Sequence, residues 1–207
     1  MKDLKGNSTA DPSWRALIQA ALHRNRSDPG VRYLQLATVD PQGHPRNRTV
    51  VFRGFLGDTD RIQLAVDSRS EKIRQIAHCS QAQICWYFCK TREQFRIAGT
   101  LEAIAADHPD PQAQRQRQQL WQQISEKGRL LWFWPEPKGP LAPPEAFIQE
   151  LPKEKDPQPQ PPQTFVALLL EPTEVDHLQL KGDQIYPQLR TVYERTPQGW
   201  QRRAVNP

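Results

Sequence analysis

The chain has 207 residues, a net charge of +5 and a mean hydropathy of −0.77, and a chain of this length is expected to form one domain with a substantial core. Its basic residues are interspersed with acidic ones and form no recognised nucleic-acid motif, so nucleic-acid binding is not expected, although excess positive charge attracts phosphate groups in general. No apolar run reaches the ~18 residues of a membrane span and residues 1–14 lack the apolar region of a secretory signal, so we expect a cytoplasmic protein that does not enter a membrane.

The N-terminal half of the sequence predicts two helices and several strands. Apolar residues at helical spacing indicate the first helix, which Asp11 or Ser13 can cap and whose first turn suits Pro12. Runs of β-branched and aromatic residues indicate the strands, and Asp40-Pro-Gln-Gly43 has the chemistry of a turn. In chain order, the expected elements are a helix at 12–25, strands at 31–39, 46–55 and 61–66, a helix at 70–79, and strands at 83–89 and 93–104.

The C-terminal half predicts one more helix, a proline-rich segment and further strands. Residues 109–125 are helix-like and rich in Gln and Arg. Residues 135–162 hold ten of the twenty prolines, a density that excludes a regular helix or a central strand, so we expect a loop or an extended arm there. Strands are expected at 164–170, at 174–180 and within 189–205. Few helices, many strands and frequent turns favour a mostly β (α+β) fold, an antiparallel barrel with a few peripheral helices in a single domain over residues 1–207.

The common motifs of cofactor sites and catalytic centres are absent from the sequence. Neither GxGxxG nor GxxxxGK[ST] occurs, which argues against a Rossmann dinucleotide site and a P-loop. The five histidines lie far apart without metal-ligand spacing, so no metal site is expected. Cys79, Cys85 and Cys89 are an odd number without a CxxC spacing, which favours a reduced protein over a disulfide framework or a zinc site.

Two basic segments remain as a candidate phosphate site. Arg48 leads into the strand with the sequence RNRTVVFRGF, where its neighbours can hold its side chain. The segment DSRSEK places Arg69, Ser70 and Lys72 at a junction between a strand and a helix, where backbone N–H groups, a hydroxyl and a cation together can bind an anion. The same residues also fit a helix cap with solvated charges, and spacing alone favours that interpretation.

Four segments occur in an order and at intervals typical of one family. They are ATVDPQGHPRNRTVVFRGF (37–55), DSRSEKIRQI (67–76), REQFRIAGTLE (92–102) and the terminal LRTVYERTPQGWQRRAVNP (189–207). With these segments the chain resembles the pyridoxamine 5′-phosphate oxidase-like FMN-binding proteins. The resemblance implies an antiparallel split β-barrel and a homodimer with FMN at the subunit interface, so that each site draws on both chains. It leaves out the N-terminal helix and the proline-rich segment.

The resemblance also implies a set of cofactor-binding residues. These are Arg48, Arg69, Ser70 and Lys72 at the FMN phosphate, Thr49, Val50 and Val51 along the flavin, Gln94 against the flavin, and Arg190 from the C-terminal segment. Lys72 is a better match than Arg69, because the family reads Ser-Arg-Lys where this chain reads Arg-Ser-Glu-Lys.

The residues that would hold the oxidase's own substrate differ from the family pattern. The family's Arg-Leu-His-Asp-Arg motif reads Tyr186-Pro-Gln-Leu-Arg190 here, Leu178 stands where a tryptophan is expected, and Arg53 replaces a lysine. We therefore do not expect pyridoxamine 5′-phosphate oxidase activity itself. Trp132 and Trp134 fit two interpretations equally well, as part of a flavin pocket or as ordinary core residues.

The cofactor implied by the resemblance is FMN, which carries redox chemistry itself while the protein binds and orients it. The first hypothesis is an FMN-dependent oxidoreductase with an unknown small-molecule substrate and no identified catalytic residue. The second is a non-catalytic flavin-binding or regulatory protein. The third is a split barrel with another cofactor, a deazaflavin or haem. A deazaflavin also has a phosphate for Arg48 and Lys72, whereas haem needs an axial ligand that no histidine is placed to supply.

Overall fold

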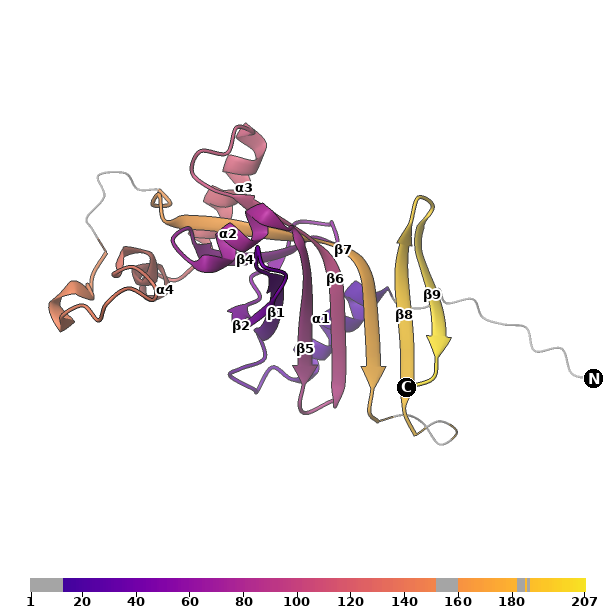
Figure 1. The fold of residues 1–207 in the computed structure, drawn as a ribbon. Coiled ribbons are helices and arrows are strands. Elements are labelled where there is room, and N and C mark those ends of the chain that lie inside the picture. The colour runs from indigo at the N-terminus through magenta and orange to yellow at the C-terminus, as the bar shows by residue number, and fades with distance from the viewer. Residues whose placement is uncertain (1–12, 152–159, 182–184, 186) are drawn as a thin grey trace, which may run out of the picture.

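The protein is built around one antiparallel sheet that curls into a half-barrel (Figure 1). The computed structural model describes residues 13–151, 160–181, 185 and 187–207. Within these residues the sheet has nine strands in the order β2-β1-β5-β6-β7-β4-β3, and β8 pairs with both β7 and β9. This confirms the prediction of a mostly β, antiparallel fold with a few helices.

The helices are α1 (Trp14–Arg24), α2 (Glu71–His78), α3 (Pro111–Gln122), α4 (Glu126–Arg129) and the short 3₁₀ helices η1 (Leu130–Phe133) and η2 (Pro144–Ala146). The strands are β1 (Tyr33–Val39), β2 (Pro45–Val51), β3 (Gly54–Phe55), β4 (Ile62–Asp67), β5 (Gln81–Phe88), β6 (Glu93–Ile104), β7 (Phe165–Gln179), β8 (Leu189–Thr196) and β9 (Gly199–Val205). No helix in the described part of the chain is long and apolar enough to cross a membrane.

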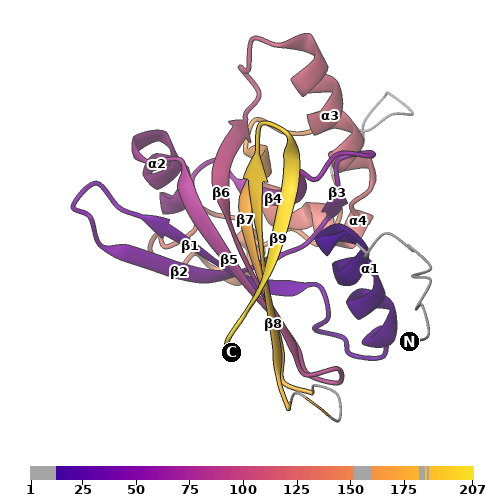
Figure 2. The same ribbon diagram turned by 90° about the vertical axis from the view of Figure 1, so that its right-hand side faces the viewer.

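Two clusters of buried side chains fill the half-barrel and attach the helices to it. The helices α1 and α2 both pack on the first cluster, and α3 packs on the second, against the opposite face of β7 (Figure 2). Ser13 caps α1, and the buried Trp14 packs edge to face on Phe55 and Trp200. A second cluster forms beneath α3, where the rings of Trp121, Trp132 and Phe165 meet one another. Asp11 and Pro12, also considered for the start of α1, lie outside the described residues.

The strand β7 corrects the prediction of two separate strands at 164–170 and 174–180. It runs unbroken through Pro172 and pairs with β6 from Ala167 to Gln179. Proline lacks an N–H to donate, and the sheet accommodates it with a bulge between Ala98 and Gly99. A Cβ atom on Gly99 would lie 2.1 Å from the Glu171 carbonyl oxygen, so only glycine lets the two backbones approach this closely.

The segment expected as one strand at 46–55 is two strands, β2 and β3. β2 ends at Val51, and the backbone N–H of Phe52 still donates to the carbonyl of Arg32, next to the last β1–β2 pair of Tyr33 and Val51. Gly54 follows with a φ of 122°, a conformation that residues with side chains rarely adopt.

The proline-rich segment forms an arm over residues 135–151, with η2 as its one helical turn (Figure 1). It follows η1 and lies beside α4 at one end of the molecule. Residues 152–159 of the predicted segment lie outside the described residues.

Candidate functional site

Arg48 lies on β2 opposite Leu36 of β1, and neutral oxygen atoms hold its guanidinium. Its Nη1 donates to the Leu36 carbonyl at 3.2 Å and to Thr38 Oγ1 at 2.6 Å. Its Nη2 donates to Gln75 Oε1 of α2 at 2.8 Å. Burial lowers the pKa of Arg48 from its usual value, although an arginine stays charged in proteins.

Lys72 lies in the first turn of α2, close to Arg48. Its Nζ donates to Ser70 Oγ at 2.9 Å, and the Ser70 hydroxyl donates to the Asp67 carbonyl at 2.7 Å. Burial lowers the pKa of Lys72, and the positive charge of Arg48 lowers it further. A bound dianion would offset the repulsion between Arg48 and Lys72, because it would favour the charged form of each side chain.

Arg69 is paired differently from these two cations. Its Nε and Nη2 donate to the two carboxylate oxygens of Asp67 at 2.9 and 2.6 Å, which raises the pKa of Arg69. One edge of its guanidinium is therefore occupied already. The role of Arg69 at a phosphate stays a prediction.

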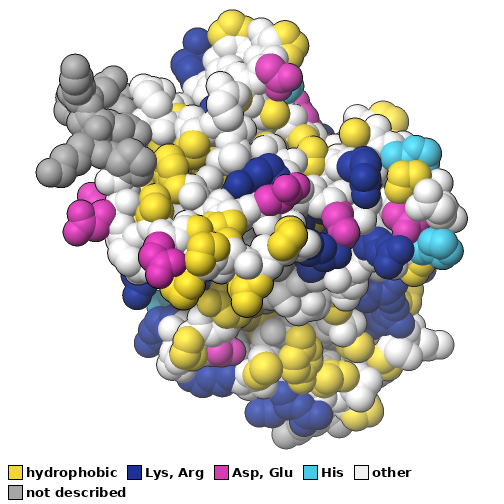
Figure 3. All heavy atoms as spheres, turned by 60° about the vertical axis from the view of Figure 1, so that its left-hand side comes forward, with side chains coloured by type: hydrophobic (Ala, Val, Ile, Leu, Met, Phe, Trp, Pro, Cys, Tyr) yellow, Lys and Arg dark blue, Asp and Glu magenta, His cyan; other side chains and the backbone are white. Residues whose placement is uncertain are grey.

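A cavity of about 550 Å³ lies beside β2 and Lys72. That volume falls within the ~300–1,000 Å³ of typical small-molecule sites. The residues around it come from β2, β4, α2, η1 and the arm, and are Thr49, Val50, Val51, Arg53, Ala65, Val66, Asp67, Lys72, Leu131, Trp132, Trp134, Pro135–Ala142 and Phe147. Figure 3 shows apolar side chains mixed with Lys and Arg side chains on the face that carries the arm.

Both tryptophans in question line this cavity, and Trp132 is a core residue as well. Trp132 is 5% exposed, and its Nε1 donates to the Val66 carbonyl at 2.9 Å. Trp134 belongs to the arm, where its Nε1 donates to the Ile148 carbonyl at 3.1 Å. Trp132 is therefore a core residue that also borders the cavity, and a role for either tryptophan at a flavin stays a prediction.

Gln94 and Arg190 lie apart from the residues around this cavity. They stand on β6 and β8, on either side of Leu178 of β7. Arg190 donates from Nε and Nη2 to Asp176 at 2.9 and 2.6 Å, which raises its pKa. The strands β1 and β5 separate β6 from β2, so Gln94 is about three strand spacings, or ~14 Å along the sheet, from the strand of Arg48. One chain thus carries two separate groups of the predicted residues.

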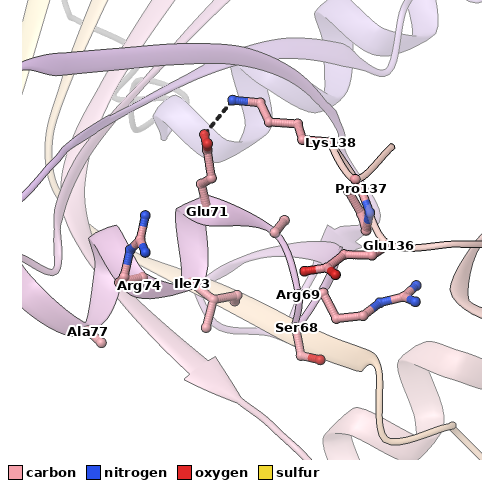
Figure 4. Close-up of a pocket in the computed structure, with 11 residues that line it drawn as sticks. Ser68, Arg69, Glu71, Ile73, Arg74, Ala77, Glu136, Pro137 and Lys138 are labelled. Carbon is pink, nitrogen blue, oxygen red and sulfur yellow. Dashed lines mark hydrogen bonds and ion pairs between the residues drawn. The ribbon is translucent and has the colours of Figure 1, made fainter. Parts of the chain in front are cut away.

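A second cavity, of about 480 Å³, adjoins the start of α2 (Figure 4). Its residues are Ser68, Arg69, Ser70, Glu71, Ile73, Arg74, Ala77, Glu136, Pro137, Lys138 and Gly139. Lys138 of the arm donates to Glu71 Oε2 at 2.5 Å and lowers the pKa of that carboxyl. This ion pair joins the arm to α2 beside the Lys72 cluster.

Sequence reasoning missed Thr38, Gln75 and Lys138. Gln75 lies one helical turn after Lys72, on the same face of α2, so the i, i+3 spacing was a usable signal. Thr38 and Lys138 gave no such signal, because only the folded chain brings them to α2.

The sequence of this chain is similar to those of pyridoxamine 5′-phosphate oxidases. Residues 11–105 match the family model of the FMN-binding domain of pyridoxamine 5′-phosphate oxidase. The chain is 42% identical over 171 residues to pyridoxine/pyridoxamine 5′-phosphate oxidase 2 of Arabidopsis thaliana, an alignment that covers 83% of this chain and 85% of the relative.

Solved structures give the same result. A pyridoxamine 5′-phosphate oxidase-related, FMN binding protein from Nostoc punctiforme has a TM-score of 0.86 and 47% identity, over 96% of this chain and 99% of that one. PhzG from Burkholderia lata, solved with tetrahydrophenazine-1-carboxylic acid, has a TM-score of 0.70 over 91% and 88% of the two chains. At 20% identity, this second likeness shows a shared fold alone.

Proposed function

Because the chain belongs to the pyridoxamine 5′-phosphate oxidase-like family of FMN-binding proteins, we propose that it binds FMN in the cavity bordered by Lys72 and by β2, the strand of Arg48, and acts as a flavin-dependent oxidoreductase on a small molecule.

The observation that carries this proposal is a pair of partly buried cations that form no direct ion pair, although the more distant charge of Glu71 acts favourably on both. In the described part of the chain, neither Arg48 nor Lys72 forms an ion pair, whereas Arg69 and Arg190 each bind an aspartate. Withdrawing positive charge from water is costly unless an opposite charge compensates for it. A phosphate dianion supplies that charge, and Arg48 and Lys72 are donors suited to it.

The backbone of β2 supports the placement of the flavin ring system. β2 ends the strand order and pairs only with β1 in the described sheet, so its other edge presents unpaired N–H and C=O groups. Thr49, Val50 and Val51 lie on this strand and border the cavity, and they can therefore hydrogen-bond a planar heterocycle through their backbone. FMN supplies the redox chemistry when bound, and these residues orient it and exclude water.

The proposal includes a homodimer. Gln94 and Arg190 lie apart from Arg48 within one chain, and a second copy can bring its own pair to the cavity. A homodimer in sedimentation velocity at micromolar concentration is the expected result. A monomer that binds FMN at full affinity would contradict the shared site.

The cofactor itself is tested by the absorbance of the purified protein and by titration of the cofactor-free protein. We expect the two-band spectrum of an oxidised flavin, bleached by a chemical reductant and restored by oxygen. A Soret band, or no saturable binding of FMN, would refute the proposal. A flavin that binds but is reduced by no candidate substrate would leave a non-catalytic flavin-binding protein.

Oxidation of pyridoxine or pyridoxamine 5′-phosphate is a second candidate, favoured by the name of the Arabidopsis relative. We expect no appreciable turnover, because Tyr186–Arg190 keeps only the last arginine of the motif that holds this substrate in the oxidases. Release of pyridoxal 5′-phosphate by the FMN-loaded protein in air would establish the second candidate.

A further inference from the structure

Two buried polar side chains, those of Thr38 and Gln75, accept hydrogen bonds from the guanidinium of Arg48. Thr38 of β1 is 2% exposed and Gln75 of α2 is 5% exposed. The Thr38 hydroxyl donates to Gln75 Oε1 at 2.7 Å, and each of the two oxygens also accepts a hydrogen bond from Arg48. Thr38 and Arg48 both donate to the Gln75 side chain, so its amide oxygen must point toward them. In the flipped orientation the NH₂ group, itself a donor, would lie against these two donors.

The remaining donors of Arg48 lie on one edge. Of the five N–H groups of an arginine, the two on Nη1 go to the Leu36 carbonyl and to Thr38, and one on Nη2 goes to Gln75. The Nε–H and the second Nη2–H are left, and Nε has no hydrogen-bond acceptor among the described residues.

The same edge of other arginines in this protein binds carboxylates. Arg69 and Arg190 each use Nε and Nη2 to hold the two oxygens of an aspartate. Two parallel N–H groups fit phosphate oxygens in the same bidentate way. The free edge of Arg48 is therefore ready to bind an anion, with its orientation already fixed.

We propose that Thr38 and Gln75 are positioning residues, which aim the Nε–Nη2 edge of Arg48 at the phosphate of the cofactor and so set the preference for FMN over riboflavin. The inference rests on the proposed function, since it requires the phosphate to bind at Arg48. A long side chain loses rotamer freedom when it binds a ligand. The hydrogen bonds to Thr38 and Gln75 already restrict the rotamers of Arg48 before the ligand binds.

The lack of charge on Gln75 contributes to the proposed preference for FMN. A glutamate here would accept the same hydrogen bonds but would also supply the negative charge that Arg48 lacks. It would then compete with the phosphate for the guanidinium. Gln75→Glu therefore keeps the size of the side chain and is expected to remove the preference for the phosphorylated flavin.

The test is the ratio of the dissociation constants for FMN and riboflavin, measured by quenching of flavin fluorescence with the full-length chain. Gln75→Met and Thr38→Val are each expected to weaken FMN binding on the order of tenfold while riboflavin binding changes less than about twofold. Gln63→Met is the matched control, because Gln63 is also buried, at 7% exposure, and its side-chain amide donates to the Phe55 carbonyl and, among the described residues, not to Arg48 or Lys72. It is expected to change neither constant.

A double-mutant cycle shows whether the pair acts through Arg48. Arg48→Ala is expected to weaken FMN binding, and Gln75→Met in that background is expected to add nothing. If Arg48→Ala leaves FMN affinity unchanged, the proposed phosphate site itself is wrong. If Arg48→Ala weakens FMN binding but the Gln75 and Thr38 variants keep the wild-type ratio, or lose both ligands equally, the positioning role is refuted. Should Gln75→Met not fold, Gln75→Glu decides by the same ratio.

Discussion

Replacing Lys72 by methionine is expected to weaken FMN binding and to stabilise the flavin-free protein. Methionine keeps the length and apolar stem of the lysine and removes only the charge and its donors. One of the three N–H donors of Lys72 goes to Ser70, which leaves two for a phosphate. A hydrogen bond to a charged group contributes about 1.5–3 kcal/mol, so the loss of FMN affinity is expected to be about 10–150-fold.

The gain in stability has a different origin. The substitution removes the repulsion between Lys72 and Arg48, which we place at a few tenths to about 1 kcal/mol, as for other partly exposed charge pairs. For a chain of this length, that corresponds to a rise in Tm of about 1–3 °C.

The pH dependence provides a second measurement. Because burial and the Arg48 charge lower the pKa of Lys72 in the folded state, the unfolded chain binds this proton more tightly. The stability of the flavin-free wild type therefore rises with pH between the lowered pKa and 10.5, the ordinary pKa of lysine. This rise is expected to be missing in Lys72→Met.

The assay is thermal and urea unfolding of the flavin-free proteins, together with titration by FMN. Lys90→Met is the control, since Lys90 is exposed in the turn between β5 and β6. An FMN affinity within twofold of wild type, or a Tm that falls by several degrees, would show that Lys72 has another role.

Three further substitutions test the fold and the arm. Gly99→Ala brings a Cβ against the Glu171 carbonyl and is expected to lower the free energy of unfolding by about 1–3 kcal/mol or more, measured in urea. Lys138→Ala breaks the exposed ion pair to Glu71 and is expected to raise the FMN dissociation rate by up to about fivefold with little change in stability, measured by stopped-flow fluorescence. Burial alone would raise the pKa of Glu93, but hydrogen bonds from His177 and Arg24 lower that pKa from 4.5 to about 2. The ionised Glu93 therefore stabilises the fold fully above pH 4.5, and this stabilisation is lost as the pH falls through about 2. Glu93→Gln is therefore expected to cost about 1–3 kcal/mol near neutral pH, and the gap to wild type should narrow below pH 4.5.

A control variant or a pH series can contradict each of these three predictions. Gly30→Ala meets only the end of a side chain at 3.3 Å, so equal losses from it and from Gly99→Ala would mean that the bulge tolerates a methyl group. Lys127 lies on α4, and Lys127→Ala should leave the FMN dissociation rate unchanged. If Lys127→Ala raises this rate as much as Lys138→Ala does, the arm does not retain the ligand through Lys138. A constant gap between Glu93→Gln and wild type from pH 7 to pH 3 would contradict the cause given for its stabilising effect.

The sequence predicted the fold class because its local patterns agree with the final structure. It failed where distant segments decide the outcome. Pro172 reads locally as the end of a strand, and β7 continues only because Gly99 on another strand allows a bulge. The run from 46 to 55 is strand-like throughout, yet β2 ends at Val51 and β3 pairs with β4 instead of β1, a change of partner that no local pattern contains.

The candidate site shows the same division. Arg48 and Lys72 stand out in the sequence as cations beside strand and helix boundaries. Thr38 and Gln75 are unremarkable there, and their role arises when α2 packs against β1. The separation of Gln94 from Arg48 follows from the strand order, which no local pattern contains.

The free edge of β2 also bears on solubility. An unpaired strand edge can pair with the edge of another molecule and start aggregation. Here the edge carries arginines, the prolines of the arm lie across the adjoining cavity, and a bound heterocycle would occupy its hydrogen-bonding groups. Loss of the ligand would uncover that edge, so a cell that makes this chain without enough cofactor is expected to accumulate it as aggregates, and added flavin is expected to raise the soluble yield.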